Sequence, residues 1–234
     1  MLVLNIASPQ HSQFGQNHCI QSIMSEIAAP LDSEYLEVAW GIKNNGEKHI
    51  PFLIPRPKVT DYAVKFEILY CGICFTDVDL GKSIGGFPTA YPFVGGHEIL
   101  GKVTEIGAKV TKFKVGDYCA VGSFIDSCKE CPNCEMGEEQ YCLNQFTGTL
   151  NFDKKHGRVG GNQATKTLGG YSGTNTVHED FVIKVPDGME IDKVAPLMCA
   201  GITMYSPLMY FGAGTKVKKT VGIIGIGTIM FLKK

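Results

Sequence analysis

The chain has 234 residues, enough for one large domain or about one and a half ordinary ones. Its 22 basic and 23 acidic residues give a formal net charge of −1, which argues against a nucleic-acid partner. A hydrophobic content of 44% with 19% charged residues is typical of a packed domain and excludes a disordered chain. The 28 glycines favour many turns or a barrel of short strands.

The N-terminal region carries little structural signal. Residues 1–35 are polar, have few charges and show no apolar period, so we expect a disordered tail in which Met24 is an alternative start. Residues 1–6 are largely apolar but lack the charged flank of a secretory signal. No arginine precedes Arg56, which disfavours a transit peptide. We therefore expect a cytoplasmic protein.

Alternation of apolar and charged side chains predicts strands after residue 59. Val64, Phe66 and Ile68 alternate with Lys65 and Glu67, which is the period of a half-buried strand. Similar patterns predict strands over residues 99–106, 118–121 and 181–185. The expected fold class is mainly β with some α.

The composition becomes helical over residues 191–209, and a last apolar strand signal covers residues 221–224. Residues 194–215 carry no charge and are long enough to span a bilayer. However, two prolines and three glycines within them favour a buried loop and helix. We expect no membrane partner.

Four closely spaced cysteines form the strongest single motif. Cys128, Cys131, Cys134 and Cys142 follow the spacing C-x2-C-x2-C-x7-C, which lets the sulfurs converge about 2.3 Å from one tetrahedral ion. The odd total of nine cysteines and the lack of a secretory signal argue against a disulfide framework. We expect a closed structural zinc site in a lobe over residues 123–145. An iron–sulfur cluster, or reduced cysteines in a loop, are the alternatives.

Four sequence motifs, in this order along the chain, resemble those of a known family. They are CGICFTD (71–77), GGHE (95–98), the four-cysteine lobe and LMCAGITMYSP (197–207). From about Trp40 to Gly227 the chain resembles the zinc-dependent medium-chain alcohol dehydrogenases, within them the cinnamyl-alcohol-dehydrogenase-like branch. The resemblance implies a GroES-like barrel catalytic domain over residues 36–190. It implies a helical connection and an incomplete dinucleotide-binding domain, with only the first strand of a Rossmann fold, over residues 191–234.

The resemblance also implies a catalytic zinc ion held by Cys74, His97 and Cys199, with a fourth position left for water or an alcohol. Glu98 would bind this zinc transiently or lie beside it. Taken singly, Cys199 could be a small core residue and His97 a satisfied buried histidine.

Three further roles concern the segment around Cys74. By the resemblance, Asp77 orients a zinc ligand without binding the metal, and Thr76 contacts the substrate oxygen and passes its proton outward. Without the resemblance, Asp77 could cap a helix and Thr76 a turn. Cys71 and Cys74 could also form a redox dithiol, although no thioredoxin-like pattern surrounds them.

The implied cofactor is NADP, with Thr203, Gly225 and Gly227 as its contacts. Gly225 and Gly227 follow an apolar strand signal as the first two glycines of a dinucleotide fingerprint, but Met230 replaces the third. Only a few residues follow, whereas one βαβ unit needs roughly 30. We interpret the chain as a truncated gene product.

Two functions are therefore expected at different levels. The resemblance implies an alcohol dehydrogenase that transfers hydride between NADP(H) and a primary alcohol or aldehyde, and relatives are usually homodimers. The alternative is a catalytically inactive zinc-binding fragment of such an enzyme, because hydride transfer needs placement to within about 3–3.5 Å.

Overall fold

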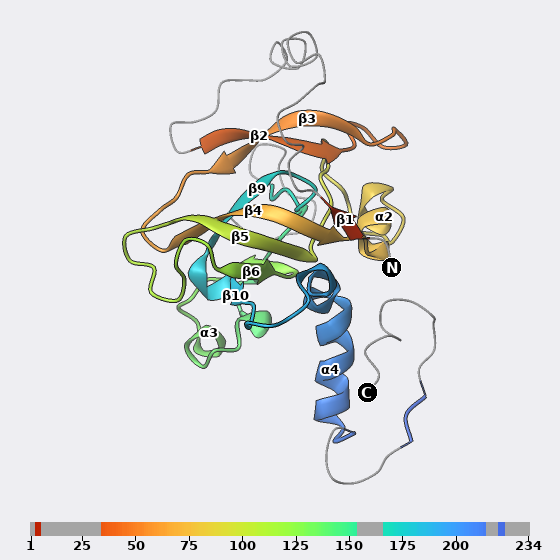
Figure 1. The fold of residues 1–234 in the computed structure, drawn as a ribbon. Helices are drawn as coiled ribbons and strands as arrows, with labels where there is room; N and C mark the ends of the chain where they lie inside the picture. The colour runs from red at the N-terminus through yellow and green to blue at the C-terminus, as the bar shows by residue number, and fades with distance from the viewer. Residues whose placement is uncertain (1–2, 6–33, 154–165, 214–219, 223–234) are drawn as a thin grey trace.

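An antiparallel sheet forms the centre of the computed structural model, which describes residues 3–5, 34–153, 166–213 and 220–222. Its strands run in the order β1-β4-β5-β6-β10, and β9 pairs with the edge of β4 (Figure 1). Their bounds are Val3–Asn5 (β1), Ala63–Gly72 (β4), Ile99–Ile106 (β5), Tyr118–Val121 (β6), Thr174–His178 (β9) and Ile183–Lys184 (β10). The mainly β fold class predicted from the sequence is confirmed.

Two smaller sheets and short helices complete the fold. A hairpin of β2 (Glu34–Gly41) and β3 (Ile50–Pro57) lies above the central sheet in Figure 1. Strands β7 (Phe124–Asp126) and β8 (Thr147–Gly148) form the other pair. The helices are α2 (Phe75–Gly81), α3 (Pro132–Glu135) and α4 (Ala200–Tyr210), with 3₁₀ turns at Glu139–Tyr141, Glu179–Phe181, Ile191–Lys193 and Ala195–Met198.

The main core lies between the hairpin and the central sheet. Val64, Phe66 and Ile68 of β4 are fully buried, while Lys65 and Glu67 between them stay partly exposed. This confirms the alternation predicted for a half-buried strand. Phe52 and Ile54 of β3 belong to the same buried cluster, so the hairpin closes the open face of the sheet.

Residues 1–35 are expected to form a disordered tail, but the structure has strands at both ends of this region. Residues 3–5 form β1, which pairs with Tyr70, Cys71 and Gly72 of β4, and β2 already begins at Glu34. The physical reason is the edge of β4: β9 pairs with its residues 63–67, and β1 satisfies the backbone groups further along. Residues 6–33 lie outside the described part of the chain.

The C-terminal expectations are met in part. The strand predicted over residues 181–185 is shortened to β10, because a 3₁₀ turn occupies residues 179–181. The helical stretch predicted over residues 191–209 is two 3₁₀ turns followed by α4, and the non-helical backbone of Cys199 separates them. Residues 220–222 form no strand, and the glycine-rich segment beyond them is outside the described ranges.

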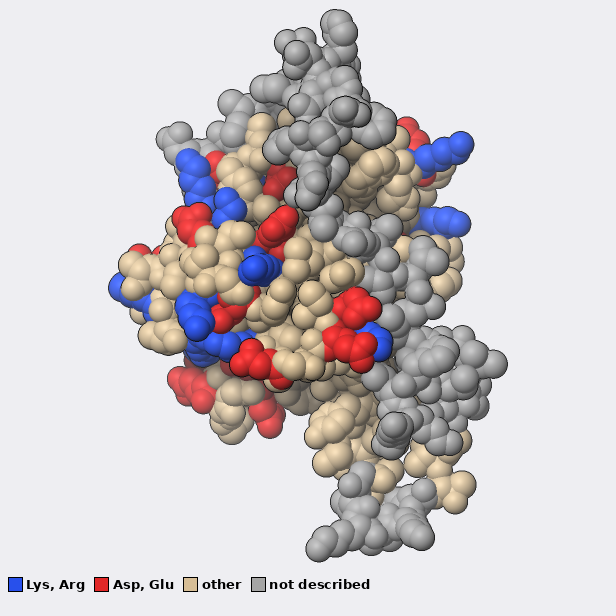
Figure 2. Space-filling view, in the orientation of Figure 1, with Lys and Arg blue, Asp and Glu red and all other residues tan. Residues whose placement is uncertain are grey.

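Charged side chains of both signs lie on the visible surface. Figure 2 shows basic and acidic side chains interspersed on the face that it presents. Among the helices of the described residues, none is long and apolar enough to cross a bilayer.

Phe66 provides a test of the core. Replacing its fully buried ring by Ala should lower the free energy of unfolding by about 3–5 kcal/mol, because a cavity remains where the ring packed. The control is Phe87→Ala, since Phe87 is 56% exposed and should change stability by only about 0.5 kcal/mol. Urea denaturation followed by circular dichroism measures both, and equal losses would contradict this account of the core.

Candidate metal centres

Two groups of metal-binding side chains converge in the fold. In the first, Cys74, His97, Glu98 and Cys199 each offer one ligand atom, and these atoms all lie within 4.8 Å of one another. They come from three distant segments: Cys74 precedes α2, His97 and Glu98 precede β5, and Cys199 precedes α4. The structure thus brings together the residues that the resemblance assigned to a catalytic metal.

Glycines allow these segments to approach closely. A side chain at Gly72 would overlap the Glu98 carboxylate, and the Gly72 N–H donates to the Glu98 carbonyl at 2.8 Å. Gly96 has φ of +98°, a conformation that other residues rarely adopt. The N–H of Gly96 donates to Asp77 Oδ1 at 2.7 Å.

Asp77 is buried and accepts hydrogen bonds on both carboxylate oxygens. Oδ1 lies 2.7 Å from the Gly96 nitrogen and 3.3 Å from His97 Nδ1. Oδ2 accepts from the Cys74 N–H at 2.9 Å and from the Tyr171 hydroxyl at 2.8 Å. Because Nδ1 faces the carboxylate, the other ring nitrogen of His97 is left for a metal.

Sequence reasoning missed Tyr171. Its hydroxyl reaches Asp77 across a sequence separation of 94 residues, and its side chain is 6% exposed. Burial and the nearby Asp77 charge raise the pKa of Tyr171 well above its ordinary value, so the hydroxyl remains a donor. No local pattern in the sequence links the two residues, although GGYS places Tyr171 directly after two glycines.

The two thiols of the first group have pKa values that shift in opposite directions. Hydrogen bonds from Cys199 and His97 lower the pKa of Cys74 to about 3, whereas the Cys74 thiolate and burial raise the pKa of Cys199. Because the first negative charge opposes the second, a cation between the sulfurs would stabilise both thiolates. An imidazole with two thiolates is a donor set that Zn²⁺ favours.

Burial affects the other two members of the group in different ways. It lowers the pKa of His97, but hydrogen bonds to Asp77 and Cys74 outweigh it and raise that pKa to about 10. Burial and the Cys74 thiolate raise the pKa of Glu98 to about 7. The site therefore already concentrates negative charge around His97, as a cation site requires.

The other predicted active-site residues have different positions. Thr76 is exposed, and its Oγ1 lies 3.5 Å from Cys74 Sγ. Thr203 is exposed on α4, in its first turn. Gly225 and Gly227 lie outside the described residues. Cys71 is fully buried, with a pKa raised by burial, and is not among the converging ligands, which disfavours a redox dithiol.

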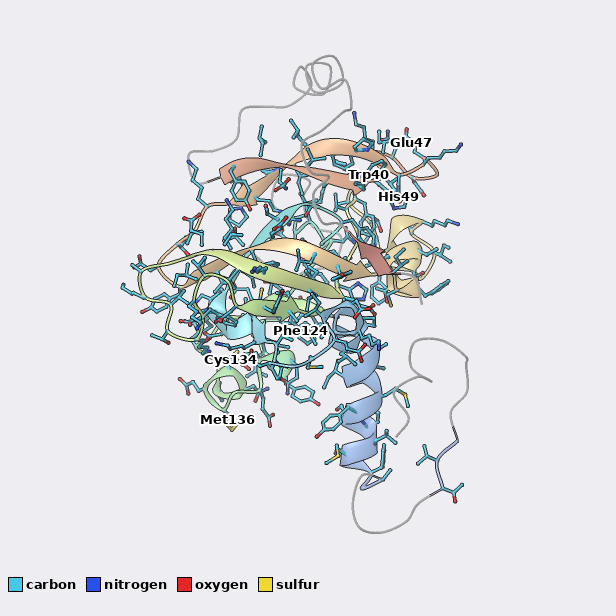
Figure 3. The ribbon with its side chains drawn as sticks, in the orientation of Figure 1. Trp40, Glu47, His49, Phe124, Cys134 and Met136 are labelled. Atoms are coloured by element: carbon cyan, nitrogen blue, oxygen red, sulfur yellow. The ribbon has the colours of Figure 1, made fainter. Side chains whose placement is uncertain are left out.

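The second group consists of the four cysteines of the lobe. The sulfurs of Cys128, Cys131, Cys134 and Cys142 also lie within 4.8 Å of one another, and those of Cys128 and Cys134 are 3.9 Å apart. Four ligands arranged tetrahedrally at about 2.3 Å from one ion would be about 3.8 Å apart, so this spacing fits a single ion. Figure 3 shows Cys134 and Met136 on the lobe below the central sheet.

The lobe has little other core. Its buried cluster consists of the cysteines themselves, while Met136, Tyr141 and Leu143 are exposed. The backbone N–H groups of Cys134 and Leu143 lower the pKa of Cys131 to about 6, which favours the thiolate. The donors and the missing apolar core together fit a closed structural ion.

Comparison with known proteins identifies the family of this chain. Residues 60–187 match the model of the alcohol dehydrogenase GroES-like domain. An NADP-dependent alcohol dehydrogenase C from Mycolicibacterium smegmatis is 47% identical over 175 residues, which are 74% of this chain and 47% of that protein. Cinnamyl alcohol dehydrogenase 7 from Arabidopsis thaliana is 42% identical over 81% of this chain and 51% of its own length.

Solved structures agree with the sequence relatives. A cinnamyl alcohol dehydrogenase from Sorghum bicolor superposes with a TM-score of 0.70 at 37% identity, covering 76% of this chain and 48% of that one. The Helicobacter pylori enzyme complexed with NADP(H) gives 0.67 at 35% identity, covering 77% and 50%. The chain spans about half the length of the relatives it matches. It belongs to the alcohol dehydrogenase family with a GroES-like domain.

Proposed function

We propose that this chain carries the zinc-binding half of the active site of an alcohol dehydrogenase that interconverts primary alcohols and aldehydes with NADP(H). The observation that carries the proposal is the convergence of Cys74, His97 and Cys199, with Glu98 beside them. The names of the relatives support the reaction class and the choice of NADP. The resemblance to the cinnamyl-alcohol-dehydrogenase-like branch supports the same substrates.

Cys74, His97 and Cys199 would hold the catalytic ion, and the adjacent Glu98 could take part in exchange of the fourth ligand. Zn²⁺ bound there would supply Lewis-acid chemistry, which stabilises negative charge on an alcohol or aldehyde oxygen. The two sulfurs are half-buried whereas His97 and Glu98 are buried, so the accessible side of the site lies toward the cysteines.

The chain's own residues orient the ligands and move the proton. Asp77 fixes the tautomer and direction of the His97 ring through Nδ1. Tyr171 and the Cys74 N–H hold the Asp77 carboxylate in place. The Thr76 hydroxyl, exposed beside Cys74 Sγ, can accept a proton from an alcohol and donate its own outward.

The four-cysteine lobe would hold a second, structural zinc ion. Four thiolates complete a tetrahedral shell, so no position remains for a substrate. The ion would stabilise the lobe in place of the apolar core that it lacks.

The domain organisation is part of the same proposal. Residues 36–190 would form the catalytic domain, and residues 191–234 the connection and the beginning of a dinucleotide-binding domain. Thr203, Gly225 and Gly227 remain predicted cofactor contacts. A cytoplasmic location, a homodimer and the inactive zinc-binding fragment likewise stay predictions.

His97→Ala tests the catalytic metal. Purified chain should contain two zinc ions, as measured by elemental analysis, and the absorbance of NADPH in the presence of an aldehyde tests whether this chain is active. His97→Ala should lose one zinc, together with any NADPH oxidation, because an imidazole ligand disappears. His49→Ala is the matched control, since His49 lies exposed on the β2–β3 hairpin (Figure 3). Two zinc ions without NADPH oxidation would instead select the inactive zinc-binding fragment.

Cys142→Ser tests the structural metal. It should remove one zinc and lower the thermal midpoint by about 5 °C or more, because metal binding contributes folding energy to the lobe. Cys119→Ala is the control: this buried cysteine of the central sheet is not among the converging ligands, and both ions should remain. Full retention of two zinc ions by Cys142→Ser would overturn the four-cysteine assignment.

Tyr171→Phe tests the positioning of Asp77. Loss of its hydrogen bond should weaken zinc binding at the His97 site about tenfold, while the four-cysteine site keeps its affinity. Chelator competition measures each affinity without any need for turnover. Tyr62→Phe, at a tyrosine that is 45% exposed, should leave both affinities unchanged. Equal affinities in Tyr171→Phe and the wild type would show that Tyr171 only fills space.

A further inference from the structure

A polar cavity lies apart from both metal centres. Its volume is about 140 Å³, and it opens between the β2–β3 hairpin and the segment of residues 166–176. None of the converging metal ligands lines it. Its wall combines apolar side chains, among them Phe52 and Ile125, with the charged residues Arg56, Lys166 and Glu34. We call it the Arg56–Lys166 cavity.

Arg56 is only partly satisfied. It is 4% exposed, and its two terminal nitrogens donate to the carbonyls of Leu168 and Gly169 and to the Ser172 hydroxyl at 2.5–2.7 Å. Its Nε is buried without a hydrogen-bond partner. Burial lowers the pKa of Arg56 to about 10, which leaves the guanidinium charged at neutral pH. No carboxylate among the described residues forms an ion pair with it.

Lys166 also has a buried charged group without a hydrogen-bond partner. Its side chain is 6% exposed overall, and its Nζ is buried without a hydrogen-bond partner. Burial lowers the pKa of Lys166 to about 8, so most molecules still carry the charge at pH 7. An unpartnered buried ammonium is costly, and native proteins almost always provide a partner for such a group.

We propose that the Arg56–Lys166 cavity binds a small carboxylate, whose negative charge pairs with the cations of Lys166 and Arg56. Both cations belong to residues that line one cavity, and interactions of charged donors with a carboxylate are the strong kind. A cavity of about 150 Å³ accommodates a benzene-sized molecule, so this one is large enough for a short-chain acid.

The charge and the walls favour a carboxylate over a phosphate. Among the described lining residues, Arg56 and Lys166 carry positive charge and Glu34 carries negative charge, which leaves an excess of about one positive charge. A phosphate group carries up to two charges and several acceptor oxygens. The apolar wall formed by Phe52 and Ile125 suits the short aliphatic body of a carboxylate.

Titration calorimetry on the whole wild-type chain tests the proposal with propionate as the probe. We expect saturable binding of one propionate per chain, with propionamide, its uncharged counterpart, at least tenfold weaker. Inorganic phosphate should bind more weakly than propionate. Absence of saturable propionate binding, equal binding of propionamide, or a preference for phosphate would each overturn the proposal. These measurements need no variant.

Substitution of Lys166 locates the site. Lys166→Met should weaken propionate binding at least tenfold, while Lys48→Met, at an exposed lysine of the β2–β3 hairpin, should leave it unchanged. Without ligand, Lys166→Met should raise the thermal midpoint by about 2–4 °C, because an unpartnered charge leaves the interior. Propionate should raise the midpoint of the wild type but not that of Lys166→Met. Undiminished propionate binding by Lys166→Met would place the ligand elsewhere.

Discussion

The candidate catalytic site depends on one buried carboxylate. Asp77 accepts hydrogen bonds from Cys74, Gly96, His97 and Tyr171, and these donors belong to segments far apart in the chain. Each carboxylate oxygen receives two of them, which offsets the cost of burying the charge. The same carboxylate thereby determines where the backbone of Cys74 lies and which nitrogen of His97 remains available.

The two candidate metal centres both use sulfur ligands but differ in accessibility. In the four-cysteine lobe, sulfur donors surround a single position and replace an apolar core. At the Asp77 site, an imidazole and a carboxylate are buried on one side while Cys74 and Cys199 remain half-buried on the other. A closed shell suits stability, whereas an accessible side suits exchange of a ligand.

The segment of residues 166–176 connects the Arg56–Lys166 cavity to the Asp77 site. Arg56 binds its backbone at Leu168 and Gly169, and two residues further Tyr171 reaches Asp77. Lys166 begins the same segment and lines the cavity. One short stretch of chain therefore supports the orientation of a candidate metal ligand on one side and forms a polar cavity on the other.

The sequence by itself determined features that are encoded locally. The alternation around Phe66 predicted a half-buried strand because side chains on a strand point to opposite faces in turn. The spacing of Cys128, Cys131, Cys134 and Cys142 indicated convergent sulfurs because neighbouring residues in a tight turn are close in space. The grouping of Cys74 with His97 and Cys199 came from the family resemblance of their motifs, not from local spacing.

Only the tertiary structure decided contacts between residues that are distant along the chain. The Tyr171 hydrogen bond to Asp77 and the meeting of Arg56 with Lys166 around one cavity leave no pattern in any short window of sequence. The pairing of residues 3–5 with β4 depends likewise on an edge that only the assembled sheet presents. Such contacts arise from how strands and loops pack, which local propensity does not specify.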